Sequence, residues 1–360
     1  MNRFAFLLHP PTADDVGHKF PRAAKLSDRT IERVLSKVPP FKISKITGVR
    51  SKQGVEIEGW FIALPRTASQ LLKMPVEDAY DLIVKAGRIA EKRGAQIFGL
   101  GAFTKVIGDK GVTIANNLKI PVTTGNSYTT ASAVETALLG AERMGIDPKQ
   151  ARVAIIGATG SIGAACCHLL AGQVGSLALI ARSEEKLQRL AGELRLTSNT
   201  SVSISTSTQQ VVPEADIVIA VSSATDILVN PGDIKPGAVV CDVARPRNVS
   251  KKVNKVRDDV LAIDGGVIRV PGSPDFGLSF GFPPGTAEAC MAETMILTCE
   301  GRFEPYTLGS DISAPQVLEI ADLAKKHGFK VDGFRRFERA INEEEIEYRR
   351  KRALLTRGTG

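Results

Sequence analysis

The feature that most constrains the fold is a glycine-rich segment between an apolar run and a helix-like segment. Residues 151–156 (ARVAII) form a largely β-branched run, typical of a parallel strand that is buried on both faces. Gly157, Gly160 and Gly163 follow with GxxGxxG spacing. Such glycines permit a tight turn and a close backbone approach to a pyrophosphate, and the next helix N-terminus offers unpaired N–H groups. The segment therefore predicts a dinucleotide-binding strand–loop–helix unit.

Strand-like runs and helical segments alternate after this loop. Further strands are predicted at 177–181, 216–221, 238–242 and 260–264, with a helix at 184–194. This alternation is typical of a doubly wound parallel sheet. We therefore predict an α/β protein with a Rossmann-type doubly wound parallel sheet and a second, N-terminal α/β domain.

The length of the chain, 360 residues, accommodates two domains. We expect an N-terminal α/β substrate domain over residues 1–148 and a cofactor domain over 149–272. A helical return segment over 273–330 and a charged C-terminal tail over 331–360, solvated in large part, are expected to follow. We expect the two domains to meet at a cleft, because ligand sites form preferentially at domain junctions.

Residues at the ends of the predicted strands indicate which dinucleotide binds. NAD-binding chains usually carry Asp or Glu after the second strand, whereas this chain has Arg182 and then Ser183. A guanidinium and a hydroxyl suit a 2′-phosphate, so NADPH is the predicted cofactor. Arg182 as a plain surface cation is the alternative. Predicted cofactor-binding residues are Gly157, Thr159, Gly160, Ser161, Ile162, Gly163, Arg182, Ser183 and Ser222, the last in a loop expected beside the adenosine half.

One of the five cysteines, Cys290, stands in a setting that favours thiolate chemistry. Thr286 is the predicted N-cap of a helix over 286–300, so Cys290 falls in about the first turn, where the positive helix end favours a thiolate. Glu293, one turn further on, is a candidate proton shuttle whose charge would also raise the thiol pKa. A small buried residue is the alternative for Cys290. The other four cysteines, Cys166, Cys167, Cys241 and Cys299, are predicted to pack in the interior or lie near a helix C-terminus.

Composition narrows the function classes. The formal net charge is +8, which favours an acidic partner or surface, but aromatic residues make up only 5% and poorly supply a stacking platform for nucleic acid. Neither the cysteines nor the four histidines have metal-ligand spacing, so no metal site is predicted. The N-terminal apolar stretch is too short for a signal peptide, and no run is long enough to span a membrane. We expect a cytoplasmic protein without a nucleic-acid partner, while a transient contact with a membrane surface and the oligomeric state stay open.

Several blocks along the chain carry a resemblance to a known family. The blocks are 99–104, 123–126, 153–163, 181–182, the loop with Asp242, Pro246 and Asn248, 265–267, 289–297 (ACMAETMIL), 300–301 and 327–329. Together they resemble the long-chain acyl-(acyl-carrier-protein) reductases best known from cyanobacteria. The likeness covers about residues 95–330, while the first 60 residues and the basic segment after Phe329 match poorly.

The resemblance implies a two-step reduction of a thioester. Cys290 would take the acyl group from a phosphopantetheine thioester to give an acyl-enzyme. Hydride from NADPH would then release a fatty aldehyde. The resemblance also implies that Asp242 belongs to the cofactor site and that Phe103, Thr124 and Asn126 contact the substrate. The donor would be an acyl carrier protein or acyl-CoA.

The basic balance of the chain fits an acidic carrier protein, because a Lys/Arg face would speed encounter with it. Candidates for such a face are Arg152, Lys251, Lys252, Lys255 and Arg257, any of which can equally be an ordinary solvated residue.

Some residues depart from the family pattern. Tyr128 stands where cyanobacterial members tend to carry His, so Tyr128 is the candidate for proton handling at that place. Lys105 stands where they tend to have a small hydroxyl residue. The segment 273–286 is rich in Gly, Pro and Phe, and Phe282, with Phe276 and Phe280, is a candidate wall of an acyl groove. The alternative is a structured linker.

Three other functions are alternatives to thioester reduction. A shikimate- or quinate-type hydroxyl dehydrogenase would use a Lys/Asp pair, which Lys105 and Asp109 could imitate, and would not need Cys290. A glutamyl-tRNA-reductase-like enzyme is disfavoured, because its nucleophilic cysteine belongs to the N-terminal domain and residues 1–165 contain no Cys. A non-catalytic NADP-binding sensor would share the cofactor loop but not a reactive Cys290.

Overall fold

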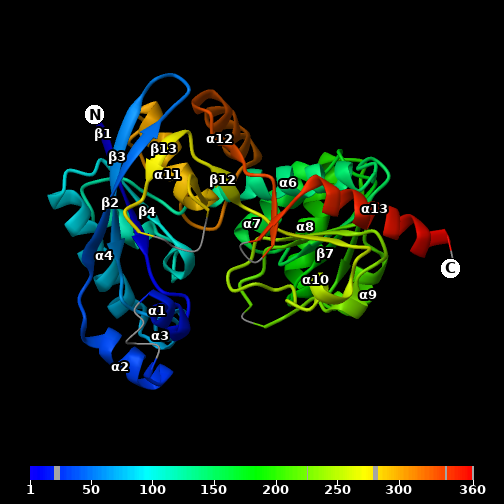
Figure 1. Cartoon of the computed structure of the whole chain (residues 1–360), viewed down its shortest axis with the longest axis horizontal. Helices are drawn as coiled ribbons and strands as arrows, with labels where there is room; N and C mark the ends of the chain where they lie inside the picture. Colours follow the sequence, from blue (N-terminus) through cyan, green and yellow to red (C-terminus); the bar gives the residue numbers. More distant parts are fainter. Residues whose placement is uncertain (20–24, 225, 279–282, 337–338, 359–360) are drawn as a thin grey trace. The chain divides into compact units, whose positions relative to one another are not determined.

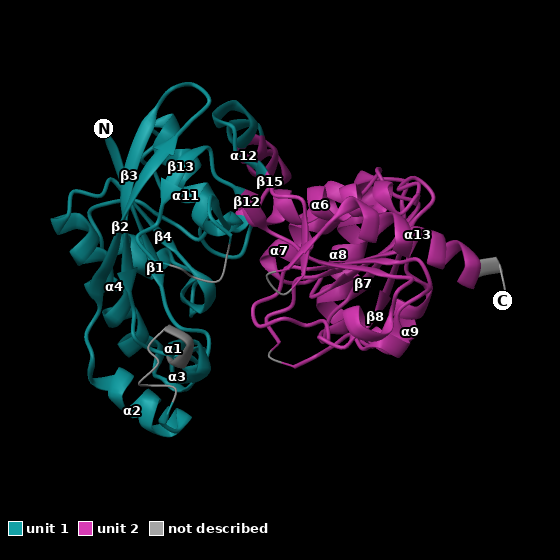
Figure 2. Ribbon diagram, in the orientation of Figure 1, with its two compact units in different colours: residues 1–126, 269–311, 322–330 teal, residues 127–268, 312–321, 331–360 magenta. Residues whose placement is uncertain are grey.

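The computed structural model describes residues 1–19, 25–224, 226–278, 283–336 and 339–358 (Figure 1). The chain divides into two compact units (Figure 2). Unit 1 contains Met1–Asn126, Arg269–Asp311 and Asp322–Lys330, and unit 2 contains Ser127–Ile268, Ile312–Ala321 and Val331–Gly360. The N-terminal part of unit 1 therefore ends at Asn126 and not near residue 148, because helix α6 (Asn126–Arg143) packs into the core of unit 2.

Unit 1 is built on a mixed six-stranded sheet in the order β13-β2-β3-β1-β4-β5. The strands are β1 (Asn2–Leu8), β2 (Phe41–Arg50), β3 (Glu56–Ala63), β4 (Ile97–Leu100), β5 (Val122–Thr123) and β13 (Gly272–Asp275). β3, β1, β4 and β5 run parallel, while β2 and β13 are antiparallel to their neighbours. β13 adds to this sheet because the chain returns to unit 1 after passing through unit 2.

Helix α11 (Ala289–Glu300) packs against this sheet. Because side chains alternate across a strand, Phe4 and Phe6 of β1 point to one face and Ala5 and Leu7 to the other. Ala5 and Leu7 share a core cluster with the buried side of helix α4 (Val76–Lys92), whereas a Cβ on Gly99 would touch both Phe6 and Thr294 of α11. α4 and α11 therefore cover opposite faces. The smaller helices are α1 (Ala13–Lys19), α2 (Asp28–Lys37), α3 (Ala68–Lys73), η2 (Ala102–Lys105) and α5 (Val112–Asn116).

Unit 2 contains an all-parallel six-stranded sheet in the order β11-β10-β9-β6-β7-β8. Its strands are β6 (Arg152–Ile156), β7 (Ser176–Ile180), β8 (Ser201–Ser205), β9 (Ile217–Ala220), β10 (Val239–Asp242) and β11 (Leu261–Asp264). Counted from β6, this is the 3-2-1-4-5-6 order of the doubly wound dinucleotide fold. The predicted fold class is therefore confirmed.

Helices and short strands complete unit 2 and the passages between the units. The helices are α7 (Ser161–Leu170), α8 (Glu184–Thr197), α9 (Thr208–Val211), η3 (Val212–Glu214), η4 (Pro231–Asp233), α10 (Val253–Val256), α12 (Ala314–His327) and α13 (Glu343–Gly358). The remaining strands are β12 (Val267–Arg269), β14 (Thr286–Glu288), β15 (Lys330–Val331), β16 (Phe334–Arg336) and β17 (Arg339–Ile341). Divisions between the units fall within β12, α12 and β15.

The C-terminal segment is exposed over most of its described residues, as expected, but it also contributes to the core of unit 2. β16 and β17 pair as a hairpin, and Phe334, Ile341 and Ile346 join the core of unit 2. Arg336 is fully buried, where its guanidinium donates to Asp264 at 2.9 Å and to the carbonyl of Val249 at 3.0 Å. The buried Arg336 is tolerated because carboxylate and carbonyl oxygens accept its N–H groups.

Candidate functional site

The glycine loop of unit 2 has the geometry that a pyrophosphate requires. Gly157 has φ +88°, and a Cβ there would lie 2.8 Å from Cα of Ser222. A Cβ on Gly163 would lie 2.2 Å from the carbonyl oxygen of Gly157, so the first turn of α7 packs directly on the loop. Gly160 is exposed and caps α7, which begins at Ser161. These residues fit a nicotinamide dinucleotide, because they leave backbone N–H groups at an open helix N-terminus.

Arg182 and Ser183 follow the carboxyl end of β7, as predicted. Arg182 is exposed, whereas Ser183 is the N-cap of α8 and accepts from the N–H of Lys186 at 3.3 Å. Ser222 accepts from the N–H of Ala224 at 3.1 Å. Ser183 and Ser222 thus have local structural bonds, and their cofactor contacts stay predictions, as do those of Thr159, Ser161 and Ile162.

Asp242 is a buried structural carboxylate at the end of β10. One oxygen accepts from the N–H groups of Ala244 and Asn248, and the other accepts from Val249 at 3.1 Å and lies 3.4 Å from the Arg336 guanidinium. Burial raises the pKa of Asp242, while Arg336 opposes that rise. The side chain therefore organises this loop, and a contact with the cofactor stays a prediction.

Cys290 lies in the first turn of α11, in unit 1. The helix begins at Ala289 with Glu288 as N-cap residue, because Thr286–Glu288 form strand β14. The prediction of Thr286 as N-cap is therefore wrong, although the predicted place of Cys290 in the first turn is correct. Gly125 packs against it: with φ +72°, a Cβ on Gly125 would lie 2.3 Å from Cα of Cys290. Only glycine fits so close to the cysteine backbone.

The environment of Cys290 favours the protonated form of its thiol. Burial raises its pKa to about 12, the charge of Lys105 lowers it, and the charge of Glu288 raises it. Sγ lies 3.7 Å from Oε2 of Glu288, in the geometry of a donated S–H bond. The helix N-terminus alone does not make this thiol a thiolate, so any reaction at Sγ needs a group that takes the proton.

Glu293 is fully buried and binds hydroxyl groups of unit 1. Its Oε1 accepts from Thr123 at 2.5 Å and from Thr307 at 2.8 Å. Thr123 Oγ1 also accepts from the N–H of Gly125 at 3.3 Å, while Thr124 donates to the carbonyl of Thr307 at 3.0 Å. Glu293 therefore helps to fix the loop that packs on Cys290, and its predicted proton-shuttle role stays a prediction.

His9 is a residue of this region that the sequence analysis missed. It is buried, and burial lowers its pKa to about 4. Its Nδ1 lies 3.1 Å from the carbonyl of Pro10, and Nε2 accepts from the N–H of Phe103 at 2.9 Å. His9 is thus a neutral imidazole that holds the predicted substrate residue Phe103. A lone histidine after a strand carries no sequence signal for this role.

The other predicted site residues are divided between the two units. Asn126 is buried in unit 1 at the start of α6. Tyr128 belongs to unit 2, where burial raises the pKa of its phenol. Phe276 is buried and stacks on Phe61 with ring centroids 6.1 Å apart, so it packs in the core and is not a groove wall. Phe280 and Phe282 lie outside the described residues.

The remaining cysteines behave as packing residues. Cys166, Cys167 and Cys241 are fully buried, and burial raises the pKa of each thiol. Cys299 lies near the end of α11, and burial raises the pKa of its thiol to about 12. Among the described residues no group of three or more His, Cys, Asp or Glu side chains is arranged to hold a metal ion.

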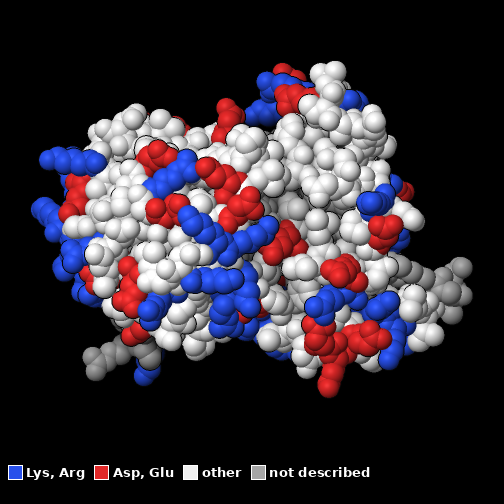
Figure 3. All heavy atoms as spheres, turned by 90° about the horizontal axis from the view of Figure 1, so that it is seen from above, with Lys and Arg blue, Asp and Glu red and all other residues white. Residues whose placement is uncertain are grey.

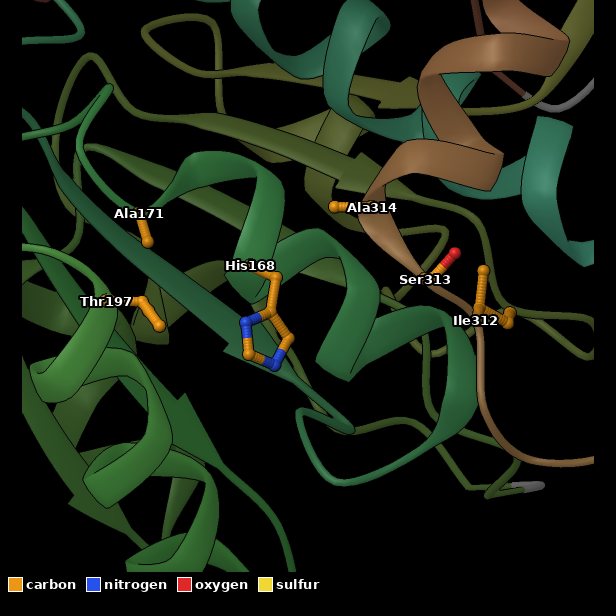
Figure 4. A pocket seen from close by; sticks show the side chains of 6 residues that line it. All are labelled: His168, Ala171, Thr197, Ile312, Ser313 and Ala314. Carbon is orange, nitrogen blue, oxygen red and sulfur yellow. The ribbon is translucent and has the colours of Figure 1, made fainter.

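A hollow of about 390 Å³ lies on unit 2, away from the predicted residues. It is lined by His168, Ala171, Thr197, Ile312, Ser313 and Ala314 (Figure 4). His168 faces Glu193, with Nε2 and Oε2 3.8 Å apart. None of the predicted cofactor or substrate residues lines this hollow.

The predicted basic face is only partly available to a partner. Arg152 pairs with Glu214, and Arg257 pairs with Asp259 at 2.7 Å, whereas Lys251, Lys252 and Lys255 are exposed. On the face shown in Figure 3, blue and red side chains are interspersed. Of the helices that the structure describes, none has the length and hydropathy needed to cross a bilayer.

One protein-family model matches part of the chain. The Shikimate / quinate 5-dehydrogenase family model matches residues 139–264, which contain the glycine loop and the parallel sheet. The match is confined to about the part that forms unit 2, so it describes the NAD(P)-binding domain and not the residues around Cys290.

Three curated proteins show similarity over longer stretches. "Aminotransferase PigE" of Serratia sp. is 32% identical over 91% of this chain, which spans 39% of that protein. "Long-chain acyl-[acyl-carrier-protein] reductase" of Synechococcus elongatus is 29% identical over 82% of this chain and 88% of its own length. "Glutamyl-tRNA reductase" of Cyanothece sp. is 26% identical over 56% of this chain and 51% of its own length.

Solved structures show only a general likeness. L-tryptophan dehydrogenase from Nostoc punctiforme is 14% identical with a TM-score of 0.39, and the alignment covers 100% of this chain and 89% of that one. Glutamyl-tRNA reductase from Methanopyrus kandleri is 15% identical with a TM-score of 0.30, covering 81% of this chain and 59% of that one. The sequence matches alone show that the chain is a distant relative of the acyl-carrier-protein reductase, PigE and glutamyl-tRNA reductase group, with an NAD(P)-binding domain similar to that of the shikimate dehydrogenase type.

Proposed function

We propose that this protein reduces an acyl thioester to an aldehyde with NADPH, through an acyl-enzyme on Cys290. The observation that carries the proposal is the environment of Cys290. The residue lies in the first turn of α11 and its backbone packs against Gly125. Its Sγ lies 3.7 Å from a carboxylate oxygen of Glu288. A thiol next to an acceptor for its proton is the arrangement that nucleophilic catalysis requires. The acyl-carrier-protein reductase named above supports the thioester as substrate.

The residues of unit 1 around Cys290 then have defined tasks. Sγ of Cys290 attacks the acyl carbon, and the peptide N–H groups at the start of α11 favour the negative charge that develops nearby. Lys105 contributes a positive charge at the same place, as its effect on the thiol pKa indicates. Glu293 and the two threonines bound to it keep Gly125 against the cysteine backbone.

The cofactor in this proposal is NADPH, held by the glycine loop and by Arg182. When bound, NADPH supplies the hydride that reduces the acyl group. Exposed Arg182 is suited to the 2′-phosphate, because a guanidinium binds phosphate oxygens in a bidentate way. The Arg182→Ala variant is expected to bind NADPH at least about tenfold more weakly while NADH binding stays unchanged, since a charge-assisted bond is worth about 1.5–3 kcal/mol.

The thioester carrier is proposed to be an acyl carrier protein or coenzyme A. Lys251, Lys252 and Lys255 are exposed together on and before α10 and would attract either acidic carrier. Binding through such exposed charges weakens with salt, so the apparent KM is expected to rise with ionic strength.

The intact mass of the protein after incubation with a long-chain acyl thioester tests the proposal. Wild-type protein is expected to gain one acyl group, which NADPH then discharges as aldehyde, while Cys290→Ser accumulates no discharging adduct. If the wild-type protein forms no adduct with several chain lengths and both carriers although it binds NADPH, the proposal is wrong. A hydroxyl dehydrogenase or a cofactor sensor would then be the remaining functions.

The hydroxyl dehydrogenase has less support in unit 1. Its Lys/Asp pair would be Lys105 and Asp109, but one Asp109 oxygen already accepts from the N–H and the hydroxyl of Thr113 at 2.9 and 2.6 Å. Asp109 thereby stabilises the start of α5, a structural role that proton transfer does not need.

A further inference from the structure

The proposed reaction needs a base for the buried thiol of Cys290, which donates to a carboxylate in the structure. Four titratable groups enter the electrostatics of this place: Lys105, Glu288 and Glu293 act on Cys290, and His9 interacts with Glu288. Each belongs to unit 1, so their relation to Cys290 is a property of that unit alone.

Three of these groups are unsuited to accept the proton. Lys105 lowers the thiol pKa, as a cation does, and a cation has no lone pair to offer. The Nε2 lone pair of His9 is engaged by the N–H of Phe103. Glu293 turns Oε1 to the hydroxyls of Thr123 and Thr307 and has its role in the packing around Gly125.

Glu288 is the group that meets the thiol directly. It ends β14 and is the N-cap residue of α11, two residues before Cys290. Its Oε2 accepts the S–H of Cys290 at 3.7 Å, a long bond of the kind that tightens when substrate binds. Its charge raises the thiol pKa, which is the expected effect of a carboxylate close to a thiol.

We propose that Glu288 is the general base and acid of the acylation step, a role that rests on the proposed function of Cys290. As Sγ attacks the acyl carbon, the thiol proton passes to Glu288 Oε2 and the new S–C bond forms. The bond between the acyl carbon and the carrier sulfur then breaks, and the proton on Glu288 passes to the leaving thiolate. The step consumes and releases no net proton and uses no electron donor.

The proposal predicts a distinctive dependence of the reaction on pH. In the wild-type protein the proton moves within the Cys290–Glu288 pair, so the reactive form is present without proton loss to solvent. In Glu288→Gln the thiolate forms only by loss of the proton to water, and the rate should rise tenfold with each pH unit. The substitution also removes the charge that opposes the thiolate, so the two profiles should converge or cross at high pH.

The test measures acylation of Cys290 by palmitoyl-CoA in single turnovers without NADPH, followed by intact mass. At about pH 6 Glu288→Gln is expected to be slower than wild type by about 10²–10⁴-fold, the usual contribution of a positioned acid–base group. Glu288→Asp should restore part of the rate. Glu56→Gln is the matched control, since Glu56 is an exposed carboxylate of the same unit that pairs only loosely with Arg50, at 3.7 Å.

A second measurement, alkylation of Cys290 by iodoacetamide across the same pH range, tests the pair without a thioester. Loss of the pH-independent part of the wild-type profile in Glu288→Gln supports the proposal. Equal rates and profiles in both proteins, or a loss of equal size at every pH, would overturn it. If palmitoyl-CoA does not acylate wild-type protein while the alkylation profiles differ as expected, the proposed function is wrong, but proton transfer from Cys290 to Glu288 is supported. If wild type is acylated and Glu288→Gln matches it, only the present proposal fails.

Discussion

The contact between Gly125 and Cys290 leads to the sharpest prediction for unit 1. A Cβ added at Gly125 would lie 2.3, 2.5 and 2.5 Å from Cα, Cβ and the carbonyl oxygen of Cys290. Backbone atoms cannot turn aside as a flexible side chain can, so the loop and the start of α11 must separate. The residue also has φ +72°, which an L-residue adopts only with strain.

The expected destabilisation of Gly125→Ala follows from these two effects. A left-handed conformation costs an L-residue about 1–2 kcal/mol, and overpacking in a full interior adds about 1–3 kcal/mol. We expect a loss of about 2–5 kcal/mol in the free energy of unfolding. Displacement of Cys290 by about 1 Å should also slow its reactions about 10²-fold.

Gly54→Ala separates backbone strain from the steric conflict. Gly54 has φ +81°, and its added Cβ would meet no atom within 4 Å. This control should lose only the strain, about 1–2 kcal/mol, and its Cys290 should react as in wild type. Urea unfolding gives the stability of both variants, and alkylation by iodoacetamide gives the reactivity. If Gly125→Ala equals Gly54→Ala within about 0.5 kcal/mol and its cysteine reacts normally, the close contact does not position Cys290.

Three further predictions concern the cofactor loop and two charge pairs. Gly163→Ala should abolish NADPH binding in a fluorescence titration, because its Cβ would lie 2.2 Å from a carbonyl of the loop, while Gly192→Ala, with open space around its Cβ, should bind NADPH normally. Arg336→Met should destabilise unit 2 by about 3–5 kcal/mol in urea unfolding, because it removes the buried guanidinium shared by Asp242 and Asp264 while Asp264 keeps its pair with Arg247, and an unchanged midpoint would contradict this. The hydrogen bond from Lys326 lowers the pKa of Glu300, so this pair stabilises the fold above the ordinary Glu pKa of 4.5 and stops doing so as pH falls through the lowered value. Glu300→Gln should therefore be less stable than wild type at neutral pH, and the gap should close in acid; a gap that is constant with pH would refute the reasoning.

The parallel sheet of unit 2 was predictable from local sequence. Its strands are nearly continuous apolar runs, because strands buried on both faces admit few polar residues, and β6 and β10 lie within a residue of their predicted ranges. The glycine loop was predictable for a similar reason. Its spacing reflects close backbone contacts within a few residues, which the structure contains at Gly157 and Gly163.

The start of α11 shows where local signals misled. A hydroxyl residue before an Ala-rich segment predicts a helix that begins at Thr286, yet Thr286–Glu288 form a strand. Whether a short segment pairs as a strand depends on a partner elsewhere in the chain, so the sequence of the segment itself does not predict the pairing. The correction moves Glu288 from within the predicted helix to its N-cap, beside the thiol of Cys290.

By itself the sequence determined the fold class, the cofactor loop and the place of Cys290 in the first turn of a helix, since each depends on residues close together in the chain. Only the tertiary structure decided what surrounds them. Arg336 is buried because it meets Asp242 and Asp264, which lie 94 and 72 positions away. Thr123 reaches Glu293 across 170 positions. Such contacts form because folding must pair buried charges and hydroxyls wherever the chain brings them together, and no local pattern records their partners.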